Sequence, residues 1–258
     1  RPATETELSA MKSILSEQIS GGCVGLSSGL EYTPSGLANP EELIELASVL
    51  QGSGYPYATH MRNEDDRLLG AIEEALHVGR LANVPVQISH LKAQGQRNYW
   101  KAQAALELIE QASADGLDVH FDRYPYTAYA TGLSNLFPSE YRAGGNQAFL
   151  NRLRDSEYAS RLEKACREKV ALLGDWNSVQ ISSTGASTSW ARGGLVGDLA
   201  RARGIEAYDL TLELLEENGG SVGMIGHGMS EENTAKILAH PLGMLCSDGG
   251  SYAPYGSL

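Results

Sequence analysis

The sequence predicts an α/β protein built on a parallel sheet. Short apolar runs alternate along the chain with longer segments in which apolar residues recur at helical spacing. Glycine, proline and asparagine separate these segments, and the connections are short. Because repeated strand–helix units form parallel sheets with right-handed crossovers, we expect that connectivity here.

The first part of the chain carries the clearest element signals. Thr4-Glu-Thr-Glu7 is a capping-box pattern, and Asn39-Pro40 places a cap residue before a proline at the first helical position. Strands are expected over 24–32, 57–60, 84–90 and 118–124, and later helices over 64–82 and 99–114. The carboxylates at 64–66 suit the first turn of the helix over 64–82, where the helix dipole favours them.

The alternation fails between 127 and 206. This stretch holds a helical piece over 149–169, a short strand over 179–182 and a loop rich in serine, threonine and glycine. So long an insertion in a compact domain is usually functional, most often as a lid. Regular alternation is expected to resume with helix 207–217, strand 221–226, helix 230–239 and strand 243–247.

The number of strands limits the architecture. Five to seven strands can be counted, whereas a closed barrel needs eight strand–helix units in about 250 residues. Since the insertion takes up much of the 258 residues, the sheet is either open and doubly wound or the later part of a barrel. The ends at Arg1 and Leu258 favour a fragment or a processed chain.

Composition excludes several classes of partner. Hydrophobic residues make up 42% and charged residues 20%, as in globular proteins, and the formal net charge is −12. This charge argues against nucleic acid and acidic membranes as partners, and no apolar run is long enough for a membrane span. Cys23, Cys166 and Cys246 form no CxxC motif, which favours reduced thiols in a cytoplasmic protein.

Two histidines end successive predicted strands. His60 closes the run over 55–60 and His90 closes the run over 84–90. Barrel enzymes carry their catalytic and metal-binding groups at the carboxyl ends of their strands, so this placement favours metal ligation over a structural role. Two imidazoles alone are too few for zinc, which takes at least three protein ligands.

Other polar residues are expected at the same edge of the sheet. Asp248 closes the strand over 243–247 and suits a general base or a metal ligand, with a turn cap as the alternative. Lys92 and Arg62 lie two residues past the histidines, either as solvated charges or as partners for a substrate carboxylate. Tyr124 precedes a proline that keeps it non-helical at a strand end, whereas His227 is expected to be structural.

Five motifs follow one another in a distinctive order: Gly25-Leu-Ser-Ser-Gly-Leu-Glu-Tyr32, His60-Met-Arg-Asn-Glu64, Ile88-Ser-His-Leu-Lys92, Asp122-Arg-Tyr-Pro-Tyr126 and Ser247-Asp-Gly249. In order and spacing they resemble the N-acyl-D-amino-acid deacylases (D-aminoacylases) of the amidohydrolase superfamily. The resemblance covers nearly the whole chain. It implies the C-terminal portion of a (β/α)8 barrel, about strands four to eight, with 127–206 inserted between the seventh and eighth strands.

The resemblance also implies an activity and roles for single residues. Zinc would be held by His60 and His90, Asp248 would be the general base, and Lys92 and Tyr124 would hold the substrate carboxylate. The substrate would be a small N-acyl-D-amino acid, hydrolysed to a carboxylate and a D-amino acid.

Two departures from the family pattern leave alternatives open. The HxH pair of the family's first strand is absent, and Cys23 lies in the wrong motif for its zinc-binding cysteine, which implies a missing N-terminal segment of the same protein. One alternative is an inactive fragment of the deacylase, in which the two histidines alone would bind zinc weakly. The other is a cyclic amidase of the dihydroorotase or hydantoinase type, which typically uses a fourth-strand lysine that 25–32 lacks.

Overall fold

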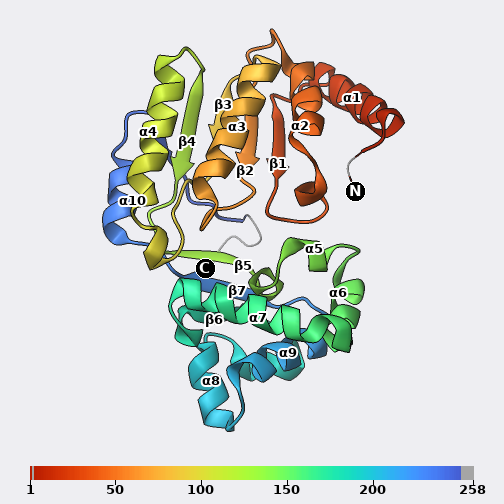
Figure 1. The fold of residues 1–258 in the computed structure, drawn as a ribbon, viewed down its shortest axis with the longest axis vertical. Coiled ribbons are helices and arrows are strands. Elements are labelled where there is room, and N and C mark those ends of the chain that lie inside the picture. The colour runs from red at the N-terminus through yellow and green to blue at the C-terminus, as the bar shows by residue number, and fades with distance from the viewer. Residues whose placement is uncertain (2, 251–258) are drawn as a thin grey trace. The chain divides into compact units, whose positions relative to one another are not determined.

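The chain divides into two compact units, labelled by element in Figure 1. The structure is a computed structural model that describes Arg1 and residues 3–250. The parallel-sheet unit comprises Arg1–Ala93, Asn98–Pro125 and Glu232–Asp248, and the antiparallel-sheet unit is built mainly from Tyr126–Glu231. Among the described residues, no helix has the length and apolar character needed to cross a membrane.

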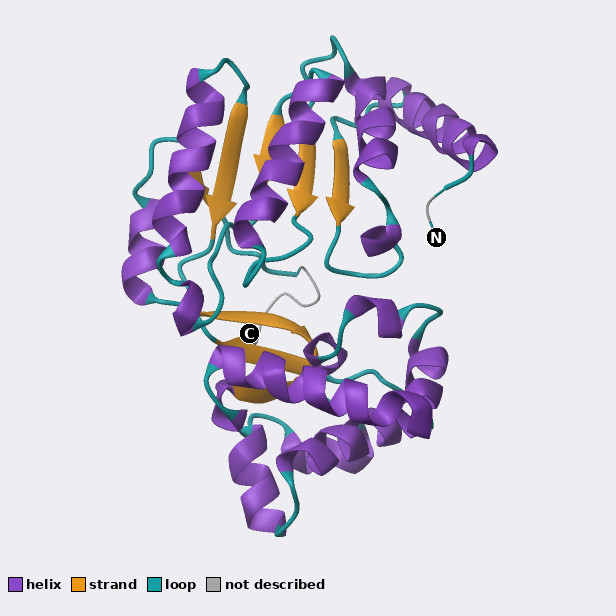
Figure 2. Cartoon of the chain, in the orientation of Figure 1, coloured by secondary structure: helices purple, strands orange, loops and turns teal. Residues whose placement is uncertain are grey.

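A five-stranded parallel sheet forms the centre of the first unit, as the alternating pattern predicts. Its strands, in spatial order, are β1 (Leu26–Gly29), β2 (Tyr57–His60), β3 (Val86–Ile88), β4 (Val119–Arg123) and β8 (Gly243–Leu245). The arrowheads of β1 to β4 point the same way in Figure 2. Residues that follow these strands therefore gather at one edge of the sheet.

The helices of this unit begin at the predicted caps. They are α1 (Glu5–Ser20), α2 (Pro40–Ala47), α3 (Leu68–Ala82), α4 (Lys101–Ala114) and α10 (Glu231–Leu238). Thr4 and Glu7 form the capping box of α1, and the Asn39 side chain accepts a hydrogen bond from the backbone of Glu42 at 2.9 Å. Helix α3 packs against both α2 and α4, and its buried stripe joins strands β3 and β4 in one apolar core that includes Ile72, Val86, Ile88, Ile109 and Phe121.

Helix α3 starts four residues later than the sequence predicts. The Asn63 side chain accepts hydrogen bonds from the backbone N–H groups of Asp65 and Arg67, at 3.1 and 2.7 Å. This local turn competes with the helix, so residues 64–66 form a loop instead of a first helical turn. The expectation that these three carboxylates lie on a helix is wrong.

The second unit has its own sheet and its own core. Three antiparallel strands pair in the order β5 (Ala128–Gly132), β7 (Gly223–His227) and β6 (Val179–Ser183). The helices are α5 (Ser139–Arg142), α6 (Asn146–Arg154), α7 (Ser156–Leu173), α8 (Val196–Arg203) and α9 (Ala207–Glu217). The strand expected over 221–226 thus exists, but it belongs to this antiparallel sheet and not to the parallel alternation.

Short 3-10 helices complete both units. They are Ser35–Leu37, Ser48–Leu50, Gln96–Asn98, Leu133–Leu136, Trp176–Ser178 and Ala186–Ala191. The serine- and threonine-rich loop contains the last of these and is held by the Asn218 side chain, which accepts a hydrogen bond from the Gly185 backbone at 2.7 Å.

Candidate metal centre

Four rings lie at or just after the ends of β1 to β4, and each is close to the next. The ring centroids of Tyr32 and His60 are 4.9 Å apart, those of His60 and His90 are 4.4 Å apart, and those of His90 and Tyr124 are 6.3 Å apart. The parallel register pairs Thr59 of β2 with Ile88 of β3, which brings the ends of these two strands together. The sheet therefore places the two strand-end histidines side by side.

The two histidines share their surroundings with a carboxylate. One ligand atom from each of His60, Glu64 and His90 can be chosen so that all three lie within 4.8 Å of one another. The two imidazole nitrogens are donors that zinc accepts, and the carboxylate beside them can either ligate the ion or accept a hydrogen bond from an imidazole N–H. The donor set and its spacing fit a divalent cation such as zinc. Asp248 is not a member of this group and is exposed.

Glu64, Lys92 and His90 form a closed triangle of polar contacts. Glu64 Oε1 lies 2.5 Å from Lys92 Nζ and 3.0 Å from His90 Nδ1, and Lys92 Nζ lies 2.8 Å from His90 Nδ1. The side chains of Glu64 and Lys92 are each 3% exposed, so water does not screen these contacts.

The charges in this triangle compensate for their burial. Burial alone would raise the pKa of Glu64, but the charges of Lys92, His60 and His90 hold that pKa well below its ordinary value. Burial lowers the pKa of Lys92, and Glu64 opposes this shift. The buried carboxylate of Glu64 and the buried ammonium of Lys92 therefore each favour the charged form of the other.

The backbone of His90 is held by a neighbouring strand. The His90 N–H donates to Asp122 Oδ1 at 2.7 Å, and Gln87 Nε2 donates to the other oxygen, Oδ2, at 2.7 Å. His90 itself has a left-handed backbone, with φ of 41°. Asp122 thus fixes a conformation that a histidine rarely adopts.

Tyr124 and Asp248 lie at the ends of adjacent strands. Tyr124 is 2% exposed, with the Arg123 guanidinium 4.2 Å and Lys92 Nζ 5.4 Å from its ring centroid. Burial raises the pKa of Tyr124, and the negative charges of Glu64 and Asp248 add to this effect. Asp248 has a left-handed backbone with φ of 50°.

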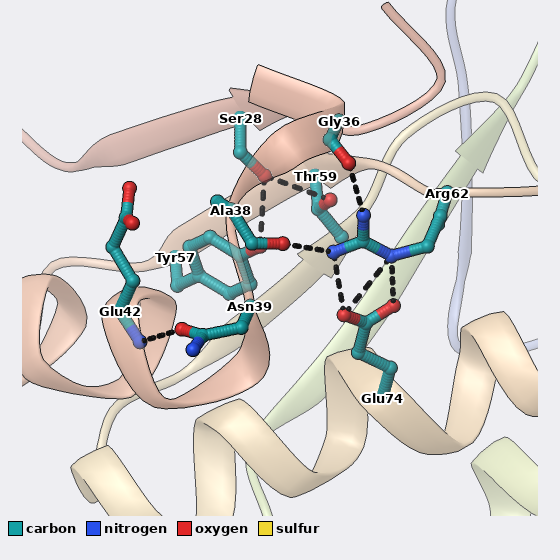
Figure 3. Close-up of polar contacts among 9 residues, drawn as sticks. All are labelled: Ser28, Gly36, Ala38, Asn39, Glu42, Tyr57, Thr59, Arg62 and Glu74. Atoms are coloured by element: carbon teal, nitrogen blue, oxygen red, sulfur yellow. Dashed lines mark hydrogen bonds and ion pairs between the residues drawn. The ribbon is translucent and has the colours of Figure 1, made fainter. Parts of the chain in front are cut away.

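Arg62 does not act as a free cation at this edge. As Figure 3 shows, its guanidinium binds the Glu74 carboxylate, with the shortest contact at 2.8 Å, and donates to the carbonyls of Gly36 and Ala38 at 2.7 and 2.9 Å. Since every guanidinium nitrogen has a partner, the expectation that Arg62 pairs with a substrate carboxylate is not supported. Arg62 instead ties β2 and α3 to the loop after β1.

That loop also contains a carboxylate that contacts the first histidine. Glu31 Oε2 lies 3.1 Å from His60 Nε2. At the end of the same strand, the Ser28 hydroxyl contacts the hydroxyls of Tyr57 at 2.7 Å and Thr59 at 3.0 Å, as drawn in Figure 3.

Sequence reasoning missed Glu31, Glu64 and Asp122 as members of this centre. The strand-end rule that identified the histidines applies equally to Glu31, which follows β1 by two residues. Asn63, a frequent turn residue, was the signal that 64–66 leave the helix.

His227 and the three cysteines are not among the grouped ligand atoms of the described residues. His227 is exposed in the second unit, where its Nε2 lies 3.2 Å from Gln180 Oε1, and its structural role stays a prediction. All three cysteines are free thiols. Burial, followed by the Asp122 carboxylate, raises the pKa of Cys246 to about 12, so this thiol is protonated at neutral pH.

Known proteins are similar to this chain in sequence and in fold, although no family model matches it. Over 258 residues, 99% of this chain, it is 31% identical to an N-acyl-D-aspartate deacylase of Alcaligenes xylosoxydans xylosoxydans and covers 43% of that protein. A solved D-aminoacylase, described as defining a subset of amidohydrolases, matches with a TM-score of 0.73 and 32% identity over 96% of this chain and 44% of its own. An N-acyl-D-glutamate deacylase from Bordetella bronchiseptica, solved with zinc and a phosphonate inhibitor, matches with a TM-score of 0.76 and 26% identity over 96% of this chain and 44% of its own.

These matches define the class of protein as an amidohydrolase. Within that class, the chain belongs to the N-acyl-D-amino-acid deacylase (D-aminoacylase) family. It spans less than half the length of the relatives it matches.

Proposed function

We propose that this chain carries part of the active site of an enzyme that hydrolyses N-acyl-D-amino acids to a carboxylate and a D-amino acid, with zinc as its metal. The observation that carries the proposal is the grouping of His60, Glu64 and His90 within 4.8 Å at the carboxyl edge of a parallel sheet. The names of the matched deacylases, one of them solved with zinc, support the same chemistry.

His60 and His90 are the proposed zinc ligands in this chain. Both end or follow central strands, and their side chains are only 17% and 10% exposed. Zinc in such a site polarises the scissile carbonyl and lowers the pKa of its water toward neutrality.

Asp248 is the proposed general base. It accepts the proton of the attacking water as the carbon–oxygen bond forms, and it then delivers that proton to the leaving nitrogen as the carbon–nitrogen bond breaks. Its place three residues after β8 and its strained backbone support a functional role, because such conformations concentrate at active sites.

Lys92 and Tyr124 are the proposed groups that hold the substrate α-carboxylate. The Lys92 ammonium is buried and lies within 5.4 Å of the Tyr124 ring centroid, so a cation and a phenol are available at adjacent strand ends. Their fixed positions would decide which enantiomer places its acyl group near the metal.

The architecture proposed for the sheet is the later part of a (β/α)8 barrel, about strands four to eight, in which the insertion expected over 127–206 extends to the end of the antiparallel-sheet unit. The pairing of β4 directly with β8 supports this, because all of the antiparallel-sheet unit built from Tyr126–Glu231 lies in sequence between two adjacent parallel strands. An insertion at this point does not interrupt the pairing of the parallel strands.

The test of the general base is Asp248→Asn in the zinc-loaded full-length protein. Asparagine keeps the size of the side chain but cannot accept the proton, and we expect kcat to fall by about 100-fold or more. The assay measures hydrolysis of an N-acyl-D-amino acid through the free amino group that the reaction releases. Wild-type turnover by this variant with zinc bound would exclude the role of Asp248.

A further inference from the structure

Glu64 lies between the proposed zinc ligands and the proposed substrate-binding lysine. The triangle that it forms with Lys92 Nζ and His90 Nδ1 has sides of 2.5, 2.8 and 3.0 Å. All three side chains are at least nine-tenths buried. No step of the proposed reaction yet uses the Glu64 carboxylate.

The hydrogen on His90 Nδ1 decides how the triangle is bonded. If Nδ1 carries it, Nδ1 donates to Glu64, and Nε2 keeps a lone pair for a metal ion. If Nδ1 is bare, it accepts from Lys92, and Nε2 then carries the hydrogen and cannot ligate. A metal-bound His90 with Nδ1 in this triangle therefore needs Glu64 as its acceptor.

We propose that Glu64 is a positioning residue for both halves of the centre, an inference that rests on the proposed function. It accepts a hydrogen bond from His90 Nδ1 and so directs Nε2 to the metal. Carboxylates that hydrogen-bond to metal-bound histidines commonly have this role. The same oxygen holds the Lys92 ammonium where the substrate carboxylate is to bind. One buried carboxylate thereby links metal binding to substrate binding.

The experiment compares Glu64→Gln with Lys92→Met in the full-length protein. The zinc Kd is measured by competition with a chromophoric chelator, and KM is measured with an N-acyl-D-amino acid. We expect Glu64→Gln to weaken zinc binding roughly 10–100-fold and to raise KM. Lys92→Met should raise KM but leave zinc affinity close to that of the wild type, because Glu64 still accepts from His90.

Glu110→Gln is the matched control. Glu110 Oε1 also contacts a histidine, since it lies 2.8 Å from His240 Nε2, but its side chain is 57% exposed and outside the metal centre. This variant should change neither zinc Kd nor KM. If Glu64→Gln does not fold, the double variant Glu64→Gln/Lys92→Met removes the unpaired ammonium, and its zinc affinity should fall below that of Lys92→Met alone.

Cobalt distinguishes positioning from direct ligation. With saturating Co²⁺, the visible absorption bands of Glu64→Gln should match those of the wild type, because the set of metal ligands is unchanged. Shifted bands would show that Glu64 is itself a ligand and would overturn the inference, as would wild-type zinc affinity and KM in Glu64→Gln. The zinc and cobalt measurements need no substrate. If the variants show the expected zinc affinities but the wild-type protein does not hydrolyse N-acyl-D-amino acids, the proposed function is contradicted and the role of Glu64 in metal binding is not.

Discussion

His90 and Asp248 are two of the three non-glycine residues with positive φ in the described part of the chain. The third, Asn83, is the C-cap of α3, a place where asparagine commonly adopts this conformation. A left-handed backbone in other residues costs on the order of 1–3 kcal/mol and persists only when neighbours hold it. For His90, the neighbour is Asp122.

The Asp122→Asn variant tests how the backbone of His90 is held. Asparagine keeps one oxygen that can accept from the His90 N–H, and its amide N–H₂ can donate to the Gln87 side-chain oxygen once that amide turns over, but both bonds lose the charged acceptor. We expect the free energy of unfolding to fall by about 1 kcal/mol, because hydrogen bonds to a charged group contribute more than neutral ones. Urea denaturation of both proteins provides the measurement.

Asp115→Asn is the control for that substitution. Asp115 also accepts from a glutamine side chain, Gln111, at 2.8 Å, but on an exposed surface where water replaces the bond. Its stability should stay within about 0.5 kcal/mol of the wild type. Equal losses in the two variants would show that Asp122 has no special role.

Single residues also show what the sequence could predict at this centre. His60 and His90 were identifiable because each closes an apolar run, and the parallel register then makes them neighbours. Glu64 was not identifiable in this way, because acidic residues ahead of an apolar stripe are typical of a first helical turn. Only the side chain of Asn63, bonded to two backbone N–H groups, excludes that helix.

At the scale of elements, α3 is the helix that fixes the spacing between the sheet and its neighbours. Gly79, in the last turn of α3, is packed so closely on β3 that an added Cβ would overlap the Val86 Cγ2 atom. Gly70, at the start of the same helix, has nothing within 4 Å of an added Cβ. One helix thus offers two glycines in opposite environments.

These two glycines give opposite predictions for substitution by alanine. Gly79→Ala should lower the free energy of unfolding by about 1–3 kcal/mol, because the helix must move away from β3. Gly70→Ala should leave it unchanged or raise it by up to about 1 kcal/mol, because alanine favours a helix where space is available. Chemical denaturation measures both, and destabilisation of the same size at both positions would contradict the packing described here.

Most elements were predictable from periodicity and caps, and the exceptions have local causes. The helical piece expected over 149–169 is two helices, α6 and α7, because Asp155 leaves the helical backbone and caps the second one. Strand β5 lacks a continuous apolar run and pairs through its backbone with β7. Neither feature appears in a hydrophobic pattern.

At the scale of the whole molecule, local patterns do not determine which strands pair. The strand over 221–226 looks like another member of the parallel alternation, yet β7 pairs antiparallel with β5 and β6. The partner of β4 is β8, whose residues lie more than a hundred positions later in the chain. Such long-range pairings depend on which sheet buries each strand, and the sequence around a strand carries little of that information.

The central claim is that zinc is bound by the histidines at the ends of β2 and β3, and the most direct test is the zinc retained per chain after dialysis of the full-length protein. We predict that His60→Asn and His90→Asn each lose bound zinc, because each removes one imidazole ligand. His240→Asn should keep it, since His240 contacts Glu110 outside the centre. Wild-type zinc content in both His60→Asn and His90→Asn would contradict the account.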